Sequence, residues 1–126
     1  MQEGDKLSKY KFNHIHLMSP DPKKTAEFYQ RTFGSTLVSS RDLGEGKLVI
    51  KLDADGVILL ISKTTDEKQF GLAHFGFGAD NLEKAVVDLK SNGVTFTKEI
   101  TEIRPGLKIS YLQAPENVQV ELQEGN

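Results

Sequence analysis

Hydrophobic and polar residues follow the same order twice along the 126-residue chain. Each copy opens with alternating apolar positions, at residues 11–18 and 72–78, and such alternation predicts a strand. A helix-like run follows each strand and ends at a glycine, Gly34 in the first copy and Gly93 in the second. Because the two signals recur in the same order, we expect two similar structural units.

The two helix-like runs carry their own start signals. In the first run, Asp21 is expected to be the N-cap, and Pro22 occupies the first helical position, where its missing N–H does no harm. In the second run, Asp80 and Glu83 have the spacing of a capping box, with Asp in place of Ser or Thr. The apolar residues expected to share one face of each helix are Ala26, Tyr29 and Phe33, then Leu82, Ala85, Val86 and Leu89.

Three more strands are expected after each helix, separated by turns rich in glycine, proline and asparagine. They span roughly residues 35–41, 47–53 and 56–62 in the first copy and 94–100, 107–113 and 118–123 in the second. Each copy is therefore a β-α-β-β-β unit. The units cover about residues 10–63 and 71–124, and the polar stretch 64–70 connects them.

One helix cannot cover both faces of a four-stranded sheet. We therefore predict an α+β fold in which two βαβββ units form a curved mixed sheet around a cleft, with the helices outside. A chain of this length suits a single domain, so residues 1–126 are expected to form one domain.

Composition and charge exclude several classes of function. The net charge of −2, with both signs interspersed, provides no patch for nucleic acid or an anionic membrane. The absence of cysteine excludes disulfides and thiolate metal sites. The longest aliphatic run, Val57 to Ile61, is too short to span a bilayer. Because the start of the chain is polar and acidic and lacks a signal-peptide core, the cytoplasm is the expected location.

All three histidines lie in the opening strands of the two copies, and His14 and His74 hold the same place in each. Residues two apart on a strand point the same way, so His14 and His16 are expected to share a face. Glu121 is a lone carboxylate within an apolar trio, and burying a charge is costly unless it is paired or bound to a cation. Two imidazoles and one carboxylate suit Fe(II), Mn(II), Ni(II) or Zn(II) and leave positions open for water or substrate.

These features resemble the vicinal oxygen chelate superfamily, which includes glyoxalase I, methylmalonyl-CoA epimerase, fosfomycin-modifying thiol transferases, extradiol dioxygenases and bleomycin-resistance proteins. The resemblance covers nearly the whole chain. Its carriers are His14 with Asp21, Phe28, Tyr29 and Gly34; His74 with Asp80 and Gly93; and Ala114, Pro115, Glu116 and Asn117 leading to Glu121. The resemblance is specific for the fold and weak for the reaction, because this scaffold supports many chemistries.

The resemblance implies that His14, His74 and Glu121 are metal ligands. The fourth ligand of the family aligns with Leu59 or Leu60, neither of which can bind a metal. Glyoxalase I and methylmalonyl-CoA epimerase usually place Glu, Gln or His at that point, so this departure counts against both activities. The remaining three-ligand pattern is similar to that of the dioxygenases and the fosfomycin transferases.

Two further residues receive roles from the resemblance. Tyr111 lies four residues before Pro115, as a substrate-contacting tyrosine does in the fosfomycin subfamily. His16 stands where many relatives have a small or apolar residue. It is interpreted as a fourth ligand, a general base or a hydrogen-bond donor to a metal-bound oxygen, or else as a residue lining the sheet with no chemical role.

The sequence therefore predicts a metal-dependent enzyme that chelates adjacent oxygens of a small substrate, with lyase or isomerase, thiol-transferase or dioxygenase chemistry. The alternative is a metal-free protein that sequesters a small molecule, as bleomycin-resistance proteins do. Those proteins usually lack the ligand histidines, which favours the enzyme. A homodimer is expected, because in short two-unit relatives the sites form where units of both chains meet. His14 is then expected to share its metal with Glu121 of the partner chain.

Overall fold

The computed structural model describes residues 9–64 and 70–125. The first copy contains β1 (Tyr10–Ser19), α1 (Pro22–Phe33), β2 (Thr36–Asp42), β3 (Leu48–Ala54) and β4 (Val57–Lys63). The second contains β5 (Gly71–Ala79), α2 (Leu82–Ser91), β6 (Phe96–Arg104), β7 (Leu107–Ala114), the short 3-10 helix η2 (Pro115–Asn117) and β8 (Val118–Gly125). Two βαβββ patterns and the α+β class are thereby confirmed. The start of the chain and most of the predicted connection, residues 64–70, lie outside the described residues.

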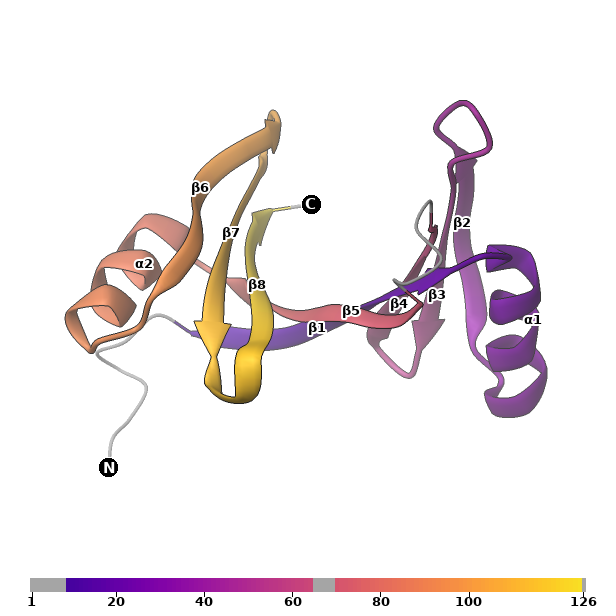
Figure 1. The fold of residues 1–126 in the computed structure, drawn as a ribbon, viewed down its shortest axis with the longest axis horizontal. Helices are drawn as coiled ribbons and strands as arrows, with labels where there is room; N and C mark the ends of the chain where they lie inside the picture. The colour runs from indigo at the N-terminus through magenta and orange to yellow at the C-terminus, as the bar shows by residue number, and fades with distance from the viewer. Residues whose placement is uncertain (1–8, 65–69, 126) are drawn as a thin grey trace. The chain divides into compact units, whose positions relative to one another are not determined.

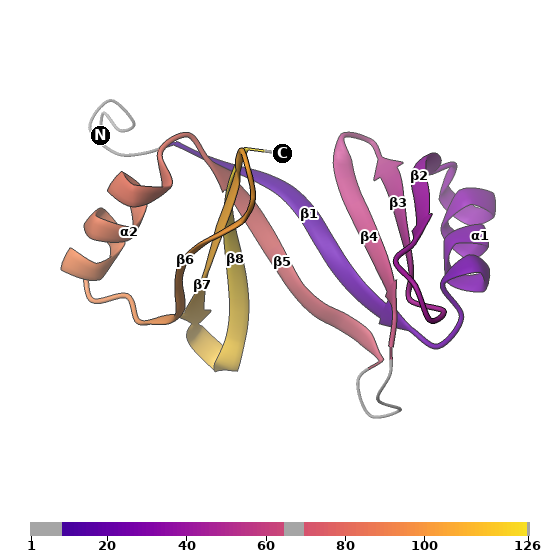
Figure 2. The same ribbon diagram turned by 90° about the horizontal axis from the view of Figure 1, so that it is seen from above.

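The eight strands belong to one mixed sheet with the order β2-β3-β4-β1-β5-β8-β7-β6. β1 pairs with β4 in parallel, whereas β2–β3, β3–β4, β6–β7 and β7–β8 are antiparallel. β1 and β5, the opening strands of the two copies, are neighbours in this order and run side by side (Figures 1 and 2). The histidine-bearing segments are thus adjacent strands.

The chain divides into two compact units whose boundaries fall inside β1 and β5. The first compact unit is Asn13–Phe75, and the second comprises Met1–Phe12 together with Gly76–Asn126. His74 opens the second sequence copy, yet it lies in the first compact unit with His14 and His16. That the units together make one domain stays a prediction.

The first compact unit has its core on one face of its strands. Helix α1 contacts β3 and β4 and lies along them (Figure 1). The buried residues of this core are Ala26, Ile50, Leu52, Leu59 and Ile61, with Ile15, Leu17 and Tyr29 packed against them. Phe33, the last residue of the predicted apolar stripe, is 71% exposed and lies outside this core. The helix therefore covers the face that carries Leu59 and Ile61, and the histidine side chains point to the other face.

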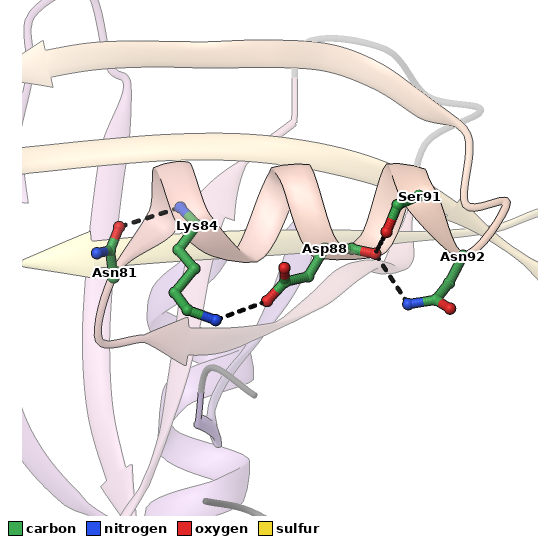
Figure 3. A network of polar contacts seen from close by, with 5 residues as sticks. All are labelled: Asn81, Lys84, Asp88, Ser91 and Asn92. Atoms are coloured by element: carbon green, nitrogen blue, oxygen red, sulfur yellow. Dashed lines mark hydrogen bonds and ion pairs between the residues drawn. The ribbon is translucent and has the colours of Figure 1, made fainter. Parts of the chain in front are cut away.

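The helix ends differ in one respect from the prediction. Asp21 caps α1, because its side chain accepts a hydrogen bond from the backbone N–H of Lys24, and Gly34 ends the helix in the left-handed conformation. At α2 the predicted cap Asp80 is wrong. The N-cap is Asn81, whose Oδ1 accepts from the N–H of Lys84 at 3.0 Å (Figure 3). The backbone is extended at Asn81, so its side chain rather than that of Asp80 reaches the free N–H groups of the first turn.

The exposed side of α2 is held by polar contacts. Lys84 forms an ion pair with Asp88 at 2.9 Å, one turn further along the helix (Figure 3). The side chains of Ser91 and Asn92 both donate to the backbone carbonyl of Asp88, which satisfies a carbonyl near the end of the helix. The buried core on the opposite side comprises Ala79, Leu82, Ala85, Val86 and Leu122. Within the described residues, no helix is long and apolar enough to cross a membrane.

Candidate metal centre

Two histidine rings face each other across the neighbouring strands β1 and β5. The centroids of His14 and His74 lie 5.6 Å apart with the rings perpendicular, and one ring nitrogen of each lies within 4.8 Å of the other. His14 is only 6% exposed. Since imidazole nitrogens bind a zinc ion at about 2.0–2.1 Å, two nitrogens at this spacing would hold one ion after a small adjustment of the rings.

The orientation of His14 is set by its sequence neighbour. Its Nδ1–H donates a hydrogen bond of 2.8 Å to Oδ1 of Asn13. In the neutral imidazole this bond fixes the tautomer that keeps the lone pair on Nε2. A carbonyl acceptor on the second nitrogen is the usual outer contact of a metal-binding histidine. The local chemistry at His14 therefore fits a divalent metal.

His16 shares the face of His14, as predicted, and adds a third ring. Its centroid lies 4.9 Å from that of His74, with an interplanar angle of 85°. Its Nε2 forms a hydrogen bond of 2.8 Å with the hydroxyl of Ser62 on β4. While this bond is held, Nε2 is not available as a ligand. His16 is thus placed beside the histidine pair with one of its two nitrogens already engaged.

The pairing of β1 with β4 decides between the two leucines that align with the missing family ligand. Leu59 belongs to the buried core beneath α1. Leu60 is opposite His16 in the register of the parallel pair, and residues opposite one another in a sheet share a face. Of the two leucines, Leu60 is therefore the one on the histidine face, at the place where the family resemblance leads us to expect a fourth ligand.

In the second compact unit, the predicted carboxylate ligand has a specific neighbour. Glu121 on β8 is 9% exposed and stands opposite Tyr111 on β7. Burial, the negative charge of Glu121 and a hydrogen bond to its carboxylate raise the pKa of the Tyr111 phenol to about 12. Tyr111 therefore keeps its proton at neutral pH and donates a hydrogen bond to the Glu121 carboxylate. The residue predicted to contact substrate thus also orients the predicted ligand.

Within each compact unit, the structure brings predicted residues together: His14, His16 and His74 in the first, Tyr111 and Glu121 in the second. Their roles as ligands, base and substrate contact stay predictions. Sequence reasoning missed Asn13 and Ser62, the partners of two histidines. Strand alternation alone puts Ser62 on the face of Leu60. The register that brings this face to His16, however, cannot be predicted from the sequence of either strand.

Family membership follows from comparison with known sequences. The family model described as the Glyoxalase/Bleomycin resistance protein/Dioxygenase superfamily matches residues 11–122. The chain therefore belongs to this family. It is 26% identical to glyoxalase I of Saccharomyces cerevisiae over 87% of this chain, but it spans only 43% of that protein's length. It is also 26% identical to the YwkD protein of Bacillus subtilis, covering 89% of this chain and 94% of YwkD.

Solved structures support the fold assignment. A Bacillus halodurans C-125 protein, BH1468, superposes with a TM-score of 0.77 at 20% identity, over 94% of this chain and 96% of the other. Methylmalonyl-CoA epimerase from Mycobacterium tuberculosis superposes with a TM-score of 0.75 at 18% identity, over 99% and 93% of the two chains. At these identities the likeness establishes the fold and leaves the reaction open.

Proposed function

We propose that this protein is a metal-dependent enzyme that holds two adjacent oxygens of a small substrate on a divalent ion. The proposed ligands are His14, His74 and Glu121. The main supporting observation is the close pair of rings of His14 and His74. The hydrogen bond from Nδ1 of His14 to Asn13 leaves the lone pair of His14 Nε2 available for a metal. Burial of Glu121 adds support, because a carboxylate so placed is stabilised by a cation. The identity of the ion is open among Fe, Mn, Ni and Zn.

His16 is the proposed proton-transfer residue. When bound, the ion supplies Lewis-acid stabilisation of negative charge on a substrate oxygen. His16 moves a proton through Nδ1, because its Nε2 is engaged with Ser62. Tyr111 keeps the Glu121 carboxylate in place through its hydrogen bond and contacts the substrate. The reaction class is lyase or isomerase chemistry, thiol transfer or, with Fe(II), dioxygenation.

Metal content tests this proposal. The protein is purified without added metal, and its metals are quantified for the native chain, for His74→Ala and for Glu121→Gln, with His16→Ala as the matched control. We expect a near-stoichiometric ion in the native chain and in the control, and little in the two ligand variants. A native chain that contains no metal, and takes up no Mn, Fe, Ni or Zn on titration, contradicts the enzyme and favours a metal-free sequestering protein.

The proposed assembly is a cytoplasmic homodimer, and one chain or two can supply the ligands of each site. Mixing refolded His14→Ala and Glu121→Gln chains separates these cases. If His14 of one chain and Glu121 of the other share each site, half of the sites in the mixed dimer are intact and metal binding returns. If all ligands belong to one chain, no site is restored. A screen with glutathione hemithioacetals, fosfomycin plus thiol, and catechols then identifies the reaction class.

A further inference from the structure

Lys51 lies on the histidine face of the first compact unit. It is opposite Leu60 in the antiparallel β3–β4 pair, and Leu60 is opposite His16 in the parallel β1–β4 pair. These three residues therefore form one row across neighbouring strands. Two strand spacings put the Cα atoms of Lys51 and His16 about 10 Å apart. The side chain of Lys51 is long enough to reach over Leu60 toward the histidines.

The ammonium group of Lys51 has no carboxylate partner among the described residues. Within the part of the chain that the structure describes, neither a hydrogen bond nor an ion pair engages Lys51, which is half-buried. Asp53 is the one carboxylate among the described strand residues of this face, and its Oδ1 accepts a hydrogen bond from the N–H of Gly56. Arg41 stands on the same face, opposite Val49, and adds a second positive charge. The face therefore carries two cations and one acid besides its histidines.

The second compact unit shows what is missing beside Lys51. There, Tyr111 occupies the corresponding place on the third strand of its unit, opposite Glu121, and donates a hydrogen bond to it. Leu60 and Glu121 are each the fourth residue of the last strand of their unit. Both units thus set a donor opposite this position. Among the described residues, only the second unit supplies an acceptor at this position, which leaves Lys51 available for a carboxylate of a bound molecule.

We propose that Lys51 binds a carboxylate of the substrate whose adjacent oxygens are held at the histidine pair. This inference rests on the proposed function and names the substrate class: a small oxygen chelator with a carboxylate a few bonds from the chelating oxygens. Leu60, the residue opposite Lys51, is apolar, and lysine side chains commonly cover such a neighbour with their aliphatic stem while the charged end stays exposed. A charge-assisted hydrogen bond in such surroundings is stronger than one between neutral groups.

A matched pair of chelators tests the inference. The monohydroxamate of succinic acid offers two adjacent oxygens at one end and a carboxylate at the other, and its primary-amide twin lacks only the charge. Binding of both to the Zn²⁺-loaded protein is measured by calorimetry. We expect the acid to bind about tenfold more tightly than the amide, which corresponds to ~1.4 kcal/mol. The preference should fall below about twofold in Lys51→Met and persist in Lys51→Arg.

The control variant is Lys23→Met, since Lys23 is an exposed lysine on α1, which covers the opposite face. It should keep the full preference. Equal binding of acid and amide to the native protein overturns the role of Lys51 while leaving the metal proposal intact. A preference that survives in Lys51→Met overturns the assignment to this residue. If none of Mn, Fe, Ni and Zn is taken up, or neither chelator binds the metal-loaded protein, the proposed function fails and this inference fails with it.

Discussion

The pair Lys51–Leu60 in the first compact unit and the pair Tyr111–Glu121 in the second stand at matching places in two similar strand patterns. In the second unit the donor and the acceptor belong to the protein, and the phenol holds the carboxylate. In the first unit Lys51 is the donor, but an apolar leucine, Leu60, occupies the position that corresponds to the acceptor Glu121. Two units with the same strand pattern can therefore have different roles. The second forms a hydrogen-bonded pair from its own residues, whereas the first leaves a donor for a bound ligand.

The opening strands differ in the same way. His14 and His74 hold matching places, but the place of His16 is taken by Gly76 in the second copy. The first compact unit therefore has an imidazole engaged with Ser62 where the other copy has no side chain. The two units resemble each other in backbone and differ in chemistry, and each of the following experiments changes one of these differences.

The largest effect is expected from making the two last strands alike. Leu60→Glu places a carboxylate on the histidine face, opposite both His16 and Lys51. It would supply the fourth ligand expected from the family resemblance, so metal affinity should rise on the order of 100-fold, since even an outer partner of a ligand is worth about 10–100-fold. Competition with a metal-sensitive dye measures the change. The control Leu60→Gln should bring a smaller gain, and unchanged affinity in both variants would refute the placement of Leu60.

A second experiment removes the donor of the complete pair. Tyr111→Phe leaves Glu121 without its hydrogen bond, and metal affinity should fall by about tenfold. In the metal-free protein, the tyrosinate absorbance step at a pKa of about 12 should also disappear. The pKa of Tyr10 is raised as well, chiefly by burial and then by the charge of Asp88, so Tyr10→Phe is the control that should keep the step near 12.

The same pKa predicts how stability depends on pH. The phenol of Tyr111 has a higher pKa in the folded than in the unfolded chain, whose value is about 10. The contribution of this phenol to the free energy of unfolding is therefore complete below pH 10 and is lost as the pH rises toward 12. Urea unfolding between these limits should show a steeper loss for the native protein than for Tyr111→Phe. Parallel losses in the two proteins would mean that the bond to Glu121 does not form.

The smallest effect is expected from the contact that distinguishes the first opening strand. Ser62→Ala removes the hydroxyl bonded to His16 and should lower the free energy of unfolding by about 1 kcal/mol. Nitrogen NMR of the imidazoles should show a changed Nε2 signal for His16 and an unchanged signal for His14, whose partner is Asn13. Ser62→Thr keeps a hydroxyl and should restore the native His16 signal. An unaltered His16 signal in Ser62→Ala would contradict the contact.

Much of the fold could be predicted from local signals. Alternating apolar residues, the proline and aspartate at the start of the first helix, and Gly34 at its end act within a few residues of one another. The error at the second helix was local too. Asp80 and Asn81 are both good caps, and their choice depends on where the backbone leaves the extended conformation.

The candidate site was predictable as far as residue type and alternation allow. That His14 and His16 share a face follows from the period of a strand. That Leu60 rather than Leu59 faces them, and that Ser62 reaches His16, depends on the register of β1 against β4, strands separated by a helix and two other strands. A one-residue shift would reverse every face, and no signal in either strand fixes this register.

The division of the chain inside β1 and β5 means that the repeat seen in the sequence and the compact body seen in the structure are different pieces of polypeptide. A fragment that ends at Lys63 retains His14 and His16 but lacks His74. Neither half of the repeat could have possessed the facing histidine pair alone. If the chain descends from a shorter ancestor by duplication, the paired imidazoles became available only when two copies of that ancestor came together.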